Sequence, residues 1–336
     1  MLEKIKISIS KSTYDILLKD CENFLFFKSS KALNKNLFLN TLIVNYYENF
    51  SSEEESFKEK LLKVINEHIN ENQLELLENI RTTISKEESV ELNKKTEIIN
   101  LKPTKLFEKH ILFIENNLIG NKSISSYYRN LFTSYARTPQ NYRELILFKD
   151  VYETLVSSIN KERKVCITLN NNEIINGVSV YKIESSKEEL FNYVLINKDN
   201  FTMTLRLSKI KYVTLLNEKR EITEKAQTMF ERQIYYGVQY PFYRHNEESV
   251  IVKLSERGQS MFKKMYIYRP IPDKVEDNLY YFNCSHAQIT HYFKRFGADA
   301  MIISPIDLVE KMKRYYFTAG KRYNQLLNKN YEKGTN

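Results

Sequence analysis

The chain has 336 residues, of which 42% are hydrophobic and 28% are charged. This length exceeds what one compact core usually holds, so we expect two or three domains. Lys and Arg number 51 against 42 Asp and Glu, a formal net charge of +9. The excess favours polyanionic partners over acidic proteins or neutral metabolites. An A·T-rich genome, which enriches Lys, Asn, Ile and Tyr, is the alternative explanation of the charge.

The composition argues against several functional classes. No stretch approaches the roughly 20 apolar residues that cross a bilayer, and the N-terminus lacks the apolar segment of a signal peptide. We therefore expect a cytoplasmic protein without a membrane partner. Three distant cysteines, Cys21, Cys166 and Cys284, fit a reducing compartment. With only 7 glycines in the chain, phosphate-binding glycine loops are not predicted, and we expect no cofactor.

The N-terminus predicts a short strand with one apolar and one polar face. Isoleucines alternate with polar residues over Lys4–Ser10. Helices are expected from Ser12 or Thr13 and from about Asn36 to Phe50. A strand followed by two helices resembles the ribbon-helix-helix fold of DNA-binding repressors, whose strand pairs with a second copy. The outward residues that could contact nucleic acid are Lys4, Lys6 and Ser8.

A second unit of the same order follows in the chain. Glu97–Thr104 predicts a strand that meets a helix start, with Pro103 in the first helical turn. A helix, a break at Gly120, a second helix over 125–135 and a longer one from about Tyr142 to Ile159 come next. This order suggests a tandem duplication, so we expect the two strands to pair antiparallel within one chain. A helical linker with a chance strand is the alternative, and a ribbon without DNA-reading function is as well supported as one that binds operator DNA.

The centre of the chain predicts five short strands at the spacing of a small SH3-like or Sm-like barrel. They are Lys164–Leu169, Glu173–Tyr181, Tyr193–Asn197, Phe201–Leu207 and Ile210–Leu216.

Two motifs in these strands resemble the WYL-domain family. Leu205–Ile210 reads Leu-Arg-Leu-Ser-Lys-Ile and is similar to the Phe-Arg-Leu-Asp-Arg-Ile segment of that family, and Val180–Tyr181 resembles its Pro-Tyr pair. The name-giving triplet is degenerate at Asn192–Val194, and Met203 stands where the family often has Arg.

The WYL resemblance implies a basic surface for nucleic acid or a nucleotide. A guanidinium can grip phosphate or stack on a base, and a tyrosine ring can stack. Alternatively, Arg206 pairs with a carboxylate and Tyr181 lies in the core. The predicted binding residues are Arg206, Lys209, Tyr181, Lys182 and Tyr193.

The C-terminal part carries the most distinctive pattern. Within Tyr281–Tyr323 we expect a helix closed by a left-handed Gly297, a buried strand over Ala300–Ser304, a break at Pro305 and a further helix. This order resembles the C-terminal extension of WYL-domain proteins.

Upstream of it, Ser249–Leu254 predicts a strand and Arg257–Met265 a helix. Basic side chains interleaved with tyrosines could contact phosphates without sequence choice. The candidates are Lys263, Lys264, Arg269, Lys294 and Arg295, followed by Arg314, Lys321 and Arg322.

The predicted architecture is α+β with three domains. They are a duplicated ribbon-helix-helix domain at 1–148, a WYL barrel at 149–238, and a C-terminal WYL extension that serves as dimerisation module at 239–330. Together they resemble the WYL accessory proteins of type VI-D CRISPR RNA-targeting systems. This resemblance implies single-stranded RNA binding, homodimerisation and enhancement of an RNA-guided effector. The alternative is a transcriptional regulator that binds operator DNA and senses a nucleotide in the barrel.

An enzymatic function is not expected. Cys284, His286 and His291 suggest a Cys/His dyad or a metal site, but their spacing matches no strong ligand motif. We therefore expect neither catalysis nor a bound metal.

Overall fold

A computed structural model describes residues 4–68, 80, 96–120, 123–199, 201–242 and 248–333. The fold mixes helices with antiparallel sheets and divides into two compact units. The first comprises Met1–Glu153 with Leu207–Lys209, and the second comprises Thr154–Arg206 with Ile210–Asn336. The three-domain boundaries expected from the sequence stay a prediction. No helix in the described part of the chain is long and apolar enough to span a bilayer.

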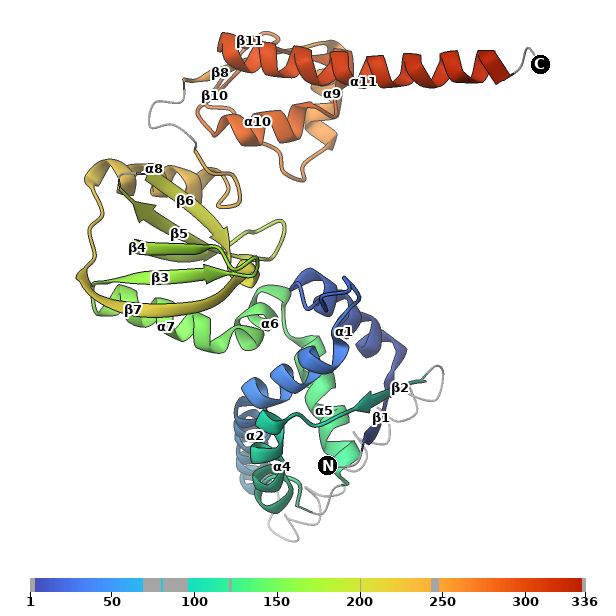
Figure 1. The fold of residues 1–336 in the computed structure, drawn as a ribbon, viewed down its shortest axis with the longest axis vertical. Coiled ribbons are helices and arrows are strands. Elements are labelled where there is room, and N and C mark those ends of the chain that lie inside the picture. Colours follow the sequence, from blue (N-terminus) through green and yellow to red (C-terminus); the bar gives the residue numbers. More distant parts are fainter. Residues whose placement is uncertain are drawn as a thin grey trace. The chain divides into compact units, whose positions relative to one another are not determined.

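The first unit consists of an antiparallel ribbon and the helices that follow each of its strands (Figure 1). Its elements are β1 (Ile5–Ser10), α1 (Lys11–Asn23), α2 (Lys35–His68), β2 (Thr96–Leu101), α4 (Lys105–Asn117), α5 (Ile124–Arg137) and α6 (Gln140–Leu147). Helix α7 (Lys149–Asn160) leads into the second unit.

The expected pairing of the two N-terminal strands is confirmed. β1 runs antiparallel to β2, with Ile7 opposite Ile99, and both side chains are buried. The other edge of β1 is closed by α5, because Arg129 Nε donates a hydrogen bond of 2.7 Å to the Ser8 carbonyl. Both edges of β1 are therefore occupied within one chain, as stable strands require.

Two helix starts differ from the predictions. Helix α1 is capped by Ser10, whose Oγ accepts the Thr13 N–H at 3.2 Å, so the cap lies earlier than Ser12. A hydroxyl that ends the strand can cap the helix directly, with no intervening loop. Pro103 precedes the cap of α4, which is Thr104, and does not lie in the first turn.

The single helix predicted over Tyr142–Ile159 is two helices. The backbone leaves helical geometry at Phe148, with φ −111° and ψ 35°. Helix α6 carries Arg143, whose Nε and Nη2 donate to both carboxylate oxygens of Asp20 at 2.6 and 3.0 Å, and Tyr135 donates to the same carboxylate at 2.9 Å. This buried network connects three helices of the first unit.

The second unit begins with a five-stranded antiparallel sheet (Figure 1). All five predicted strands are confirmed, in the order β6-β5-β4-β3-β7. No ladder between described residues joins β6 to β7, so a closed barrel is not found. Strand spacing predicts hairpins but not closure, which depends on tilt and stagger. The strands are β3 (Arg163–Leu169), β4 (Ile174–Ser185), β5 (Asn192–Lys198), β6 (Phe201–Arg206) and β7 (Ile210–Lys219).

Helix α8 (Glu224–Tyr236) covers part of this sheet and was not predicted. Thr223 caps it by accepting the Ala226 N–H at 3.2 Å. Its inner face packs Ala226 and Phe230 against Leu195 of β5, and all three side chains are fully buried. The cap and the helical spacing of these apolar residues are a readable signal in the sequence.

A four-stranded sheet with three helices completes the second unit, in the order β11-β8-β10-β9. Gly297 has the expected left-handed φ of +59°, but it does not close the helix, because the preceding helix ends at Phe293 with Lys294 as its cap. The predicted strand and the following helix are present. The elements are β8 (Val250–Leu254), α9 (Glu256–Lys264), β9 (Lys274–Glu276), β10 (Leu279–Phe282), α10 (His286–Phe293), β11 (Ala300–Ser304) and α11 (Ile306–Lys333).

Gly258 fixes α9 against the turn that follows α10. A Cβ at this position would lie 2.1 Å from the Asp299 carbonyl oxygen, so no other residue fits without movement. Ser255 supports the same contact, since its Oγ donates to Asp299 Oδ1 at 2.7 Å. Helix α9 is thereby held in place relative to the turn after α10.

Candidate nucleic-acid interface

Four of the predicted binding residues lie on neighbouring strands of the five-stranded sheet. Tyr181 and Lys182 belong to β4, Tyr193 to β5 and Arg206 to β6, and Tyr193 lies directly opposite Arg206. We call these four residues the sheet cluster. Lys209 is exposed at the end of the short helical segment Leu207–Lys209, which joins β6 to β7.

Both tyrosines of the sheet cluster bind carboxylates. The Tyr181 hydroxyl donates to Glu231 of α8, and its ring stacks on Phe230 with centroids 5.0 Å apart. The Tyr193 hydroxyl donates to Glu189. Burial, and then the hydrogen bond to Glu231, raises the pKa of Tyr181 to about 12. Phe230 of the core therefore covers one face of the Tyr181 ring, while the side chain as a whole is half-buried.

The two cations of the sheet cluster are also engaged. Lys182 Nζ lies 2.6 Å from Glu184 Oε1, and this hydrogen bond raises the pKa of Lys182. The guanidinium carbon of Arg206 lies 3.3 Å from the centroid of the Phe191 ring. Phe191 was not singled out from the sequence, yet it supports the guanidinium by a cation–π contact.

The outward face of the ribbon carries few charges. Lys4 and Lys6 are exposed and Ser8 is half-buried. Across the ribbon, Asn100 lies opposite Lys6, and Ile98, which is 64% exposed, lies opposite Ser8. This face can offer two ammonium groups and an amide to a nucleic acid.

The predicted basic residues of the C-terminal module lie at the ends of two helices. Lys263 and Lys264 are the last residues of α9, Lys294 and Arg295 follow α10, and Arg269 lies in the loop after α9. We call these five residues the basic rim. Cations are favoured here because carbonyl groups at helix C-termini carry partial negative charge.

Contacts with aromatic rings hold both guanidinium groups of the basic rim. The Arg269 guanidinium carbon lies 5.6 Å from the Phe262 ring centroid, and its Nη1 donates to the Phe262 carbonyl at 3.3 Å. The Arg295 guanidinium carbon lies 5.0 Å from the Tyr292 ring centroid, and its Nη2 donates to the Ile267 carbonyl at 3.3 Å. Each group keeps further N–H donors for an external acceptor.

No direct ion pair neutralises the basic rim within the part of the chain that the structure describes, although Glu188 Oε1 accepts the Tyr268 N–H of the loop after α9 at 3.0 Å. None of its five cations forms an ion pair with a described carboxylate. The same loop exposes Tyr266 by 71% and Ile267 by 53%. Tyr266 was not predicted as a site residue, although it lies between Lys264 and Arg269 in the sequence. Cations beside an exposed ring form the usual surface for single-stranded nucleic acid.

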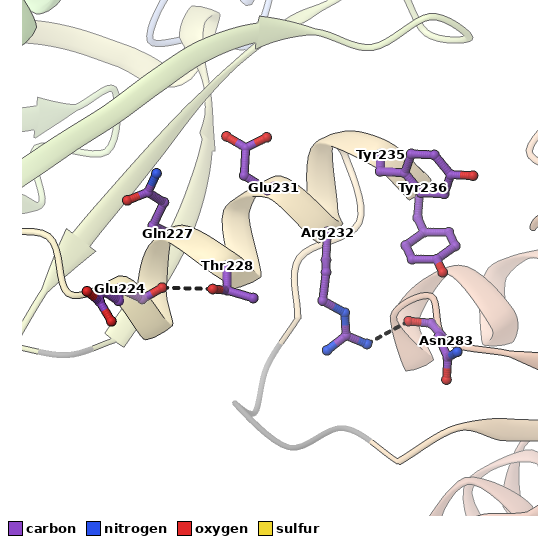
Figure 2. A pocket seen from close by; sticks show the side chains of 8 residues that line it. All are labelled: Glu224, Gln227, Thr228, Glu231, Arg232, Tyr235, Tyr236 and Asn283. Atoms are coloured by element: carbon purple, nitrogen blue, oxygen red, sulfur yellow. Dashed lines mark hydrogen bonds between the residues drawn. The ribbon is translucent and has the colours of Figure 1, made fainter.

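An open pocket of about 840 Å³ lies along α8 (Figure 2). Arg232 Nη2 donates to the Asn283 carbonyl at 2.8 Å, so part of its guanidinium is already used. Two carboxylates face the same space, which disfavours phosphate. The lining residues are Glu224, Gln227, Thr228, Glu231, Arg232, Tyr235, Tyr236 and Asn283.

The histidines considered for catalysis have structural contacts. His286 Nε2 lies 3.0 Å from the Glu248 carbonyl oxygen, and the His291 ring lies 5.6 Å from Tyr240 and 5.2 Å from Tyr268, between centroids. Over the described residues, no group of three or more His, Cys, Asp or Glu side chains is arranged to hold a metal ion.

Comparisons with known proteins support the fold. No protein-family model and no curated protein matches the chain. The structure is similar to the crystal structure of a CRISPR Cas-related protein, with a TM-score of 0.66, 19% sequence identity, and coverage of 97% of this chain and 95% of that chain. The proteasome accessory factor B/C of Arthrobacter aurescens gives a TM-score of only 0.25 at 14% identity, over 63% of this chain and 34% of that chain, which is too low to indicate a shared fold. The chain thus shares its overall fold with a CRISPR Cas-related protein, whereas its WYL resemblance rests on sequence motifs.

Proposed function

We propose that this chain is a nucleic-acid-binding accessory protein that binds single-stranded RNA through its basic rim. The observation that carries the proposal is the group of five cations without carboxylate partners among the described residues, beside the exposed Tyr266 ring. A single strand offers phosphates to the cations and unpaired bases to the ring. A duplex keeps its bases stacked inside, so the ring would contribute less to duplex binding.

We further propose that the RNA-bound chain enhances an RNA-guided CRISPR effector. The shared fold with a CRISPR Cas-related protein and the WYL-type motifs support this assignment. In this proposal the five-stranded sheet corresponds to a WYL barrel. The first unit, with its ribbon, corresponds to a duplicated ribbon-helix-helix domain. The chain acts by binding and not by catalysis. Target cleavage by the cognate effector should be faster with the chain than without it, and slower again with a rim variant.

We propose homodimerisation through the C-terminal module. β11 lies at the edge of its sheet and exposes Met301 by 61% and Ile303 by 45%, and Ile306 is 73% exposed at the start of α11. An apolar group beside an unpaired strand edge favours association. Light scattering should give the mass of a dimer, and Met301→Glu/Ile303→Glu should give that of a monomer.

Fluorescence anisotropy with a labelled oligouridine RNA tests the proposed function. The rim variant carries Gln at 263, 264, 269 and 295, and the control carries Gln at four exposed lysines of the first unit, namely Lys58, Lys60, Lys105 and Lys109. Both variants remove four positive charges, so non-specific effects of net charge cancel. We expect the rim variant, and not the control, to bind RNA weakly. The slope of log affinity against log salt concentration should also be flatter by about 0.7 for each phosphate that the variant no longer binds. Equal binding by both variants contradicts the proposal.

Operator binding is the second candidate function, favoured by the paired ribbon with Lys6 and Asn100 on its outer face. It predicts tighter binding to a promoter duplex than to unstructured RNA, and loss of the duplex complex in Lys6→Ala. The rim variant should then bind duplex as the unmodified chain does.

A further inference from the structure

Helix α11 has a packed side and an exposed side. Leu308 and Met312 are buried in the core of the C-terminal module, and Val309 and Tyr316 pack against it. The C-terminal half of the helix extends past the sheet and helices of that module (Figure 1). Its exposed side is therefore not needed to complete this core.

The exposed part of α11 is strongly basic and aromatic. The stretch Lys311–Leu327 contains five basic residues and no acidic residue. Three of the cations and two tyrosines border the same open surface of the helix, namely Lys311, Arg314, Arg322, Tyr315 and Tyr323. At about 3.6 residues per turn, Lys311, Tyr315 and Arg322 lie on one side of the helix, and Arg314 and Tyr323 lie at its two opposite edges.

The two tyrosines of this face are available to a ligand. Tyr315 is 50% exposed and Tyr323 is 70% exposed. They lie two turns apart on the helix, or about 12 Å along its axis. Within the described residues, no carboxylate pairs with Lys311, Arg314 or Arg322. Phosphate ligands would therefore meet cations that have no competing acidic partner in this part of the chain.

We propose that this face of α11 binds a single-stranded polynucleotide. The cations would contact phosphates and the tyrosine rings would stack on bases. This inference rests on the proposed function and adds a second contact beyond the basic rim. A second copy of the chain fits the face poorly, because a twofold interface sets the same patch against itself. Such a pairing would bring like charges together, which disfavours association.

Two matched variants of the full-length chain test the proposal. Tyr315→Ala/Arg322→Gln removes one ring and one cation from the proposed face. Lys313→Gln/Phe317→Ala removes one cation and one ring that are exposed on the opposite side of the same helix. Because all four of these side chains are exposed, neither variant should affect folding, which thermal unfolding checks.

Anisotropy with oligouridine RNA is the readout. Without one stacked base and one bound phosphate, the first variant should bind about tenfold more weakly or worse, and the second should bind as the unmodified chain does. Equal affinities of the two variants would overturn the proposal. The proposal would also be overturned if the first variant alone changed its mass in light scattering and kept its RNA affinity. The face would then be an interface between two copies of the chain. If the unmodified chain binds no RNA, both the proposed function and this inference fail. If the rim variant binds RNA weakly but Tyr315→Ala/Arg322→Gln binds it as the unmodified chain does, this inference alone fails.

Discussion

The basic rim and the sheet cluster were both predicted to bind polyanions, the first from its basic composition and the second from the WYL resemblance, yet they differ in what their charges contact. Three of the four sheet-cluster side chains, Tyr181, Lys182 and Tyr193, bind a carboxylate. The cations of the rim have no such partner among the described residues. A polyanion at the sheet cluster must compete with carboxylates bound directly to the cluster residues, whereas in the loop of the rim the carboxylate of Glu188 contacts the Tyr268 N–H. The comparison teaches that basic residues predict a binding surface only where their neighbours leave the charge uncompensated.

Charge reversal in the rim should have the largest effect. Arg269→Glu/Arg295→Glu places two carboxylates beside the RNA, and like-charge contacts cost several kcal/mol. We expect RNA affinity to fall by about a hundredfold or more. The same reversal at Lys182 should have little effect, because Glu184 already neutralises this position. Similar losses at both positions would show that the two regions do not differ.

Substitution of Gly258 should disturb the rim through the fold. A Cβ there meets the Asp299 carbonyl, so Gly258→Ala must displace α9, at a cost of about 1–3 kcal/mol for overpacking. Thermal unfolding should show this destabilisation. RNA affinity should decrease as well, since α9 carries Lys263 and Lys264 at its end. Gly320→Ala is a suitable control, because its Cβ would meet no atom within 4 Å.

Removal of the exposed ring should separate stacking from charge. Tyr266→Ala should weaken RNA binding by about fivefold or more, the lower end expected for one stacked base. The salt dependence should not change, because every cation is retained. Tyr266→Phe keeps the ring and should restore affinity. If Tyr266→Ala instead flattens the salt dependence, the ring supports the cations and does not contact a base.

Arg206→Ala should affect stability more than RNA binding. The substitution removes the cation–π contact with Phe191, worth about 0.5–2 kcal/mol. Denaturant unfolding should detect this change, while the anisotropy curve should move little. A large decrease in RNA affinity with unchanged stability would shift the binding surface to the sheet cluster.

Protonation of His291 should give the smallest effect. Burial, and then the nearby Lys294 and Arg295, lower the pKa of His291 below 6.5, while Glu189 acts in the opposite direction. Between the pKa of His291 in the folded chain and its value of 6.5 in the unfolded chain, the unfolded chain binds more protons. The contribution of His291 to the free energy of unfolding is therefore complete above pH 6.5. It is lost as the pH falls towards the pKa in the folded chain. His291→Gln should remove this part of the pH dependence.

RNA on the rim should alter this titration. Phosphates beside Lys294 and Arg295 would offset their charge and raise the pKa of His291, which NMR can follow at the imidazole ring. An unchanged pKa in saturating RNA would place the RNA elsewhere.

Patterns within short segments were sufficient to predict most strands. Alternation in Lys4–Ser10 predicted β1, and the repeated order of strand and helices predicted its pairing with β2. Gly297 and Pro305 on either side of Ala300–Ser304 predicted β11. Closure of the five-stranded sheet could not be predicted, because it depends on geometry and not on local pattern. Lys182 and Glu184 are two residues apart on one strand face, so their pairing was readable.

The remaining contacts of the sheet cluster could not be predicted from the sequence. Nothing local indicates that Phe191 supports Arg206 or that Glu231 of α8 meets Tyr181. These pairs are brought together by the ladder of β5 with β6 and by the packing of α8 on the sheet. The rim was found by composition, since helix ends rich in Lys and Arg stay exposed.

Photocrosslinking of a labelled RNA to the full-length chain, with adducts mapped by mass spectrometry, tests the central claim most directly. The account predicts adducts at Tyr266 and in the adjoining loop up to Arg269, at an RNA concentration that saturates the anisotropy signal. Adducts confined to Tyr181 and Tyr193 of the sheet cluster, with none at Tyr266, would contradict it.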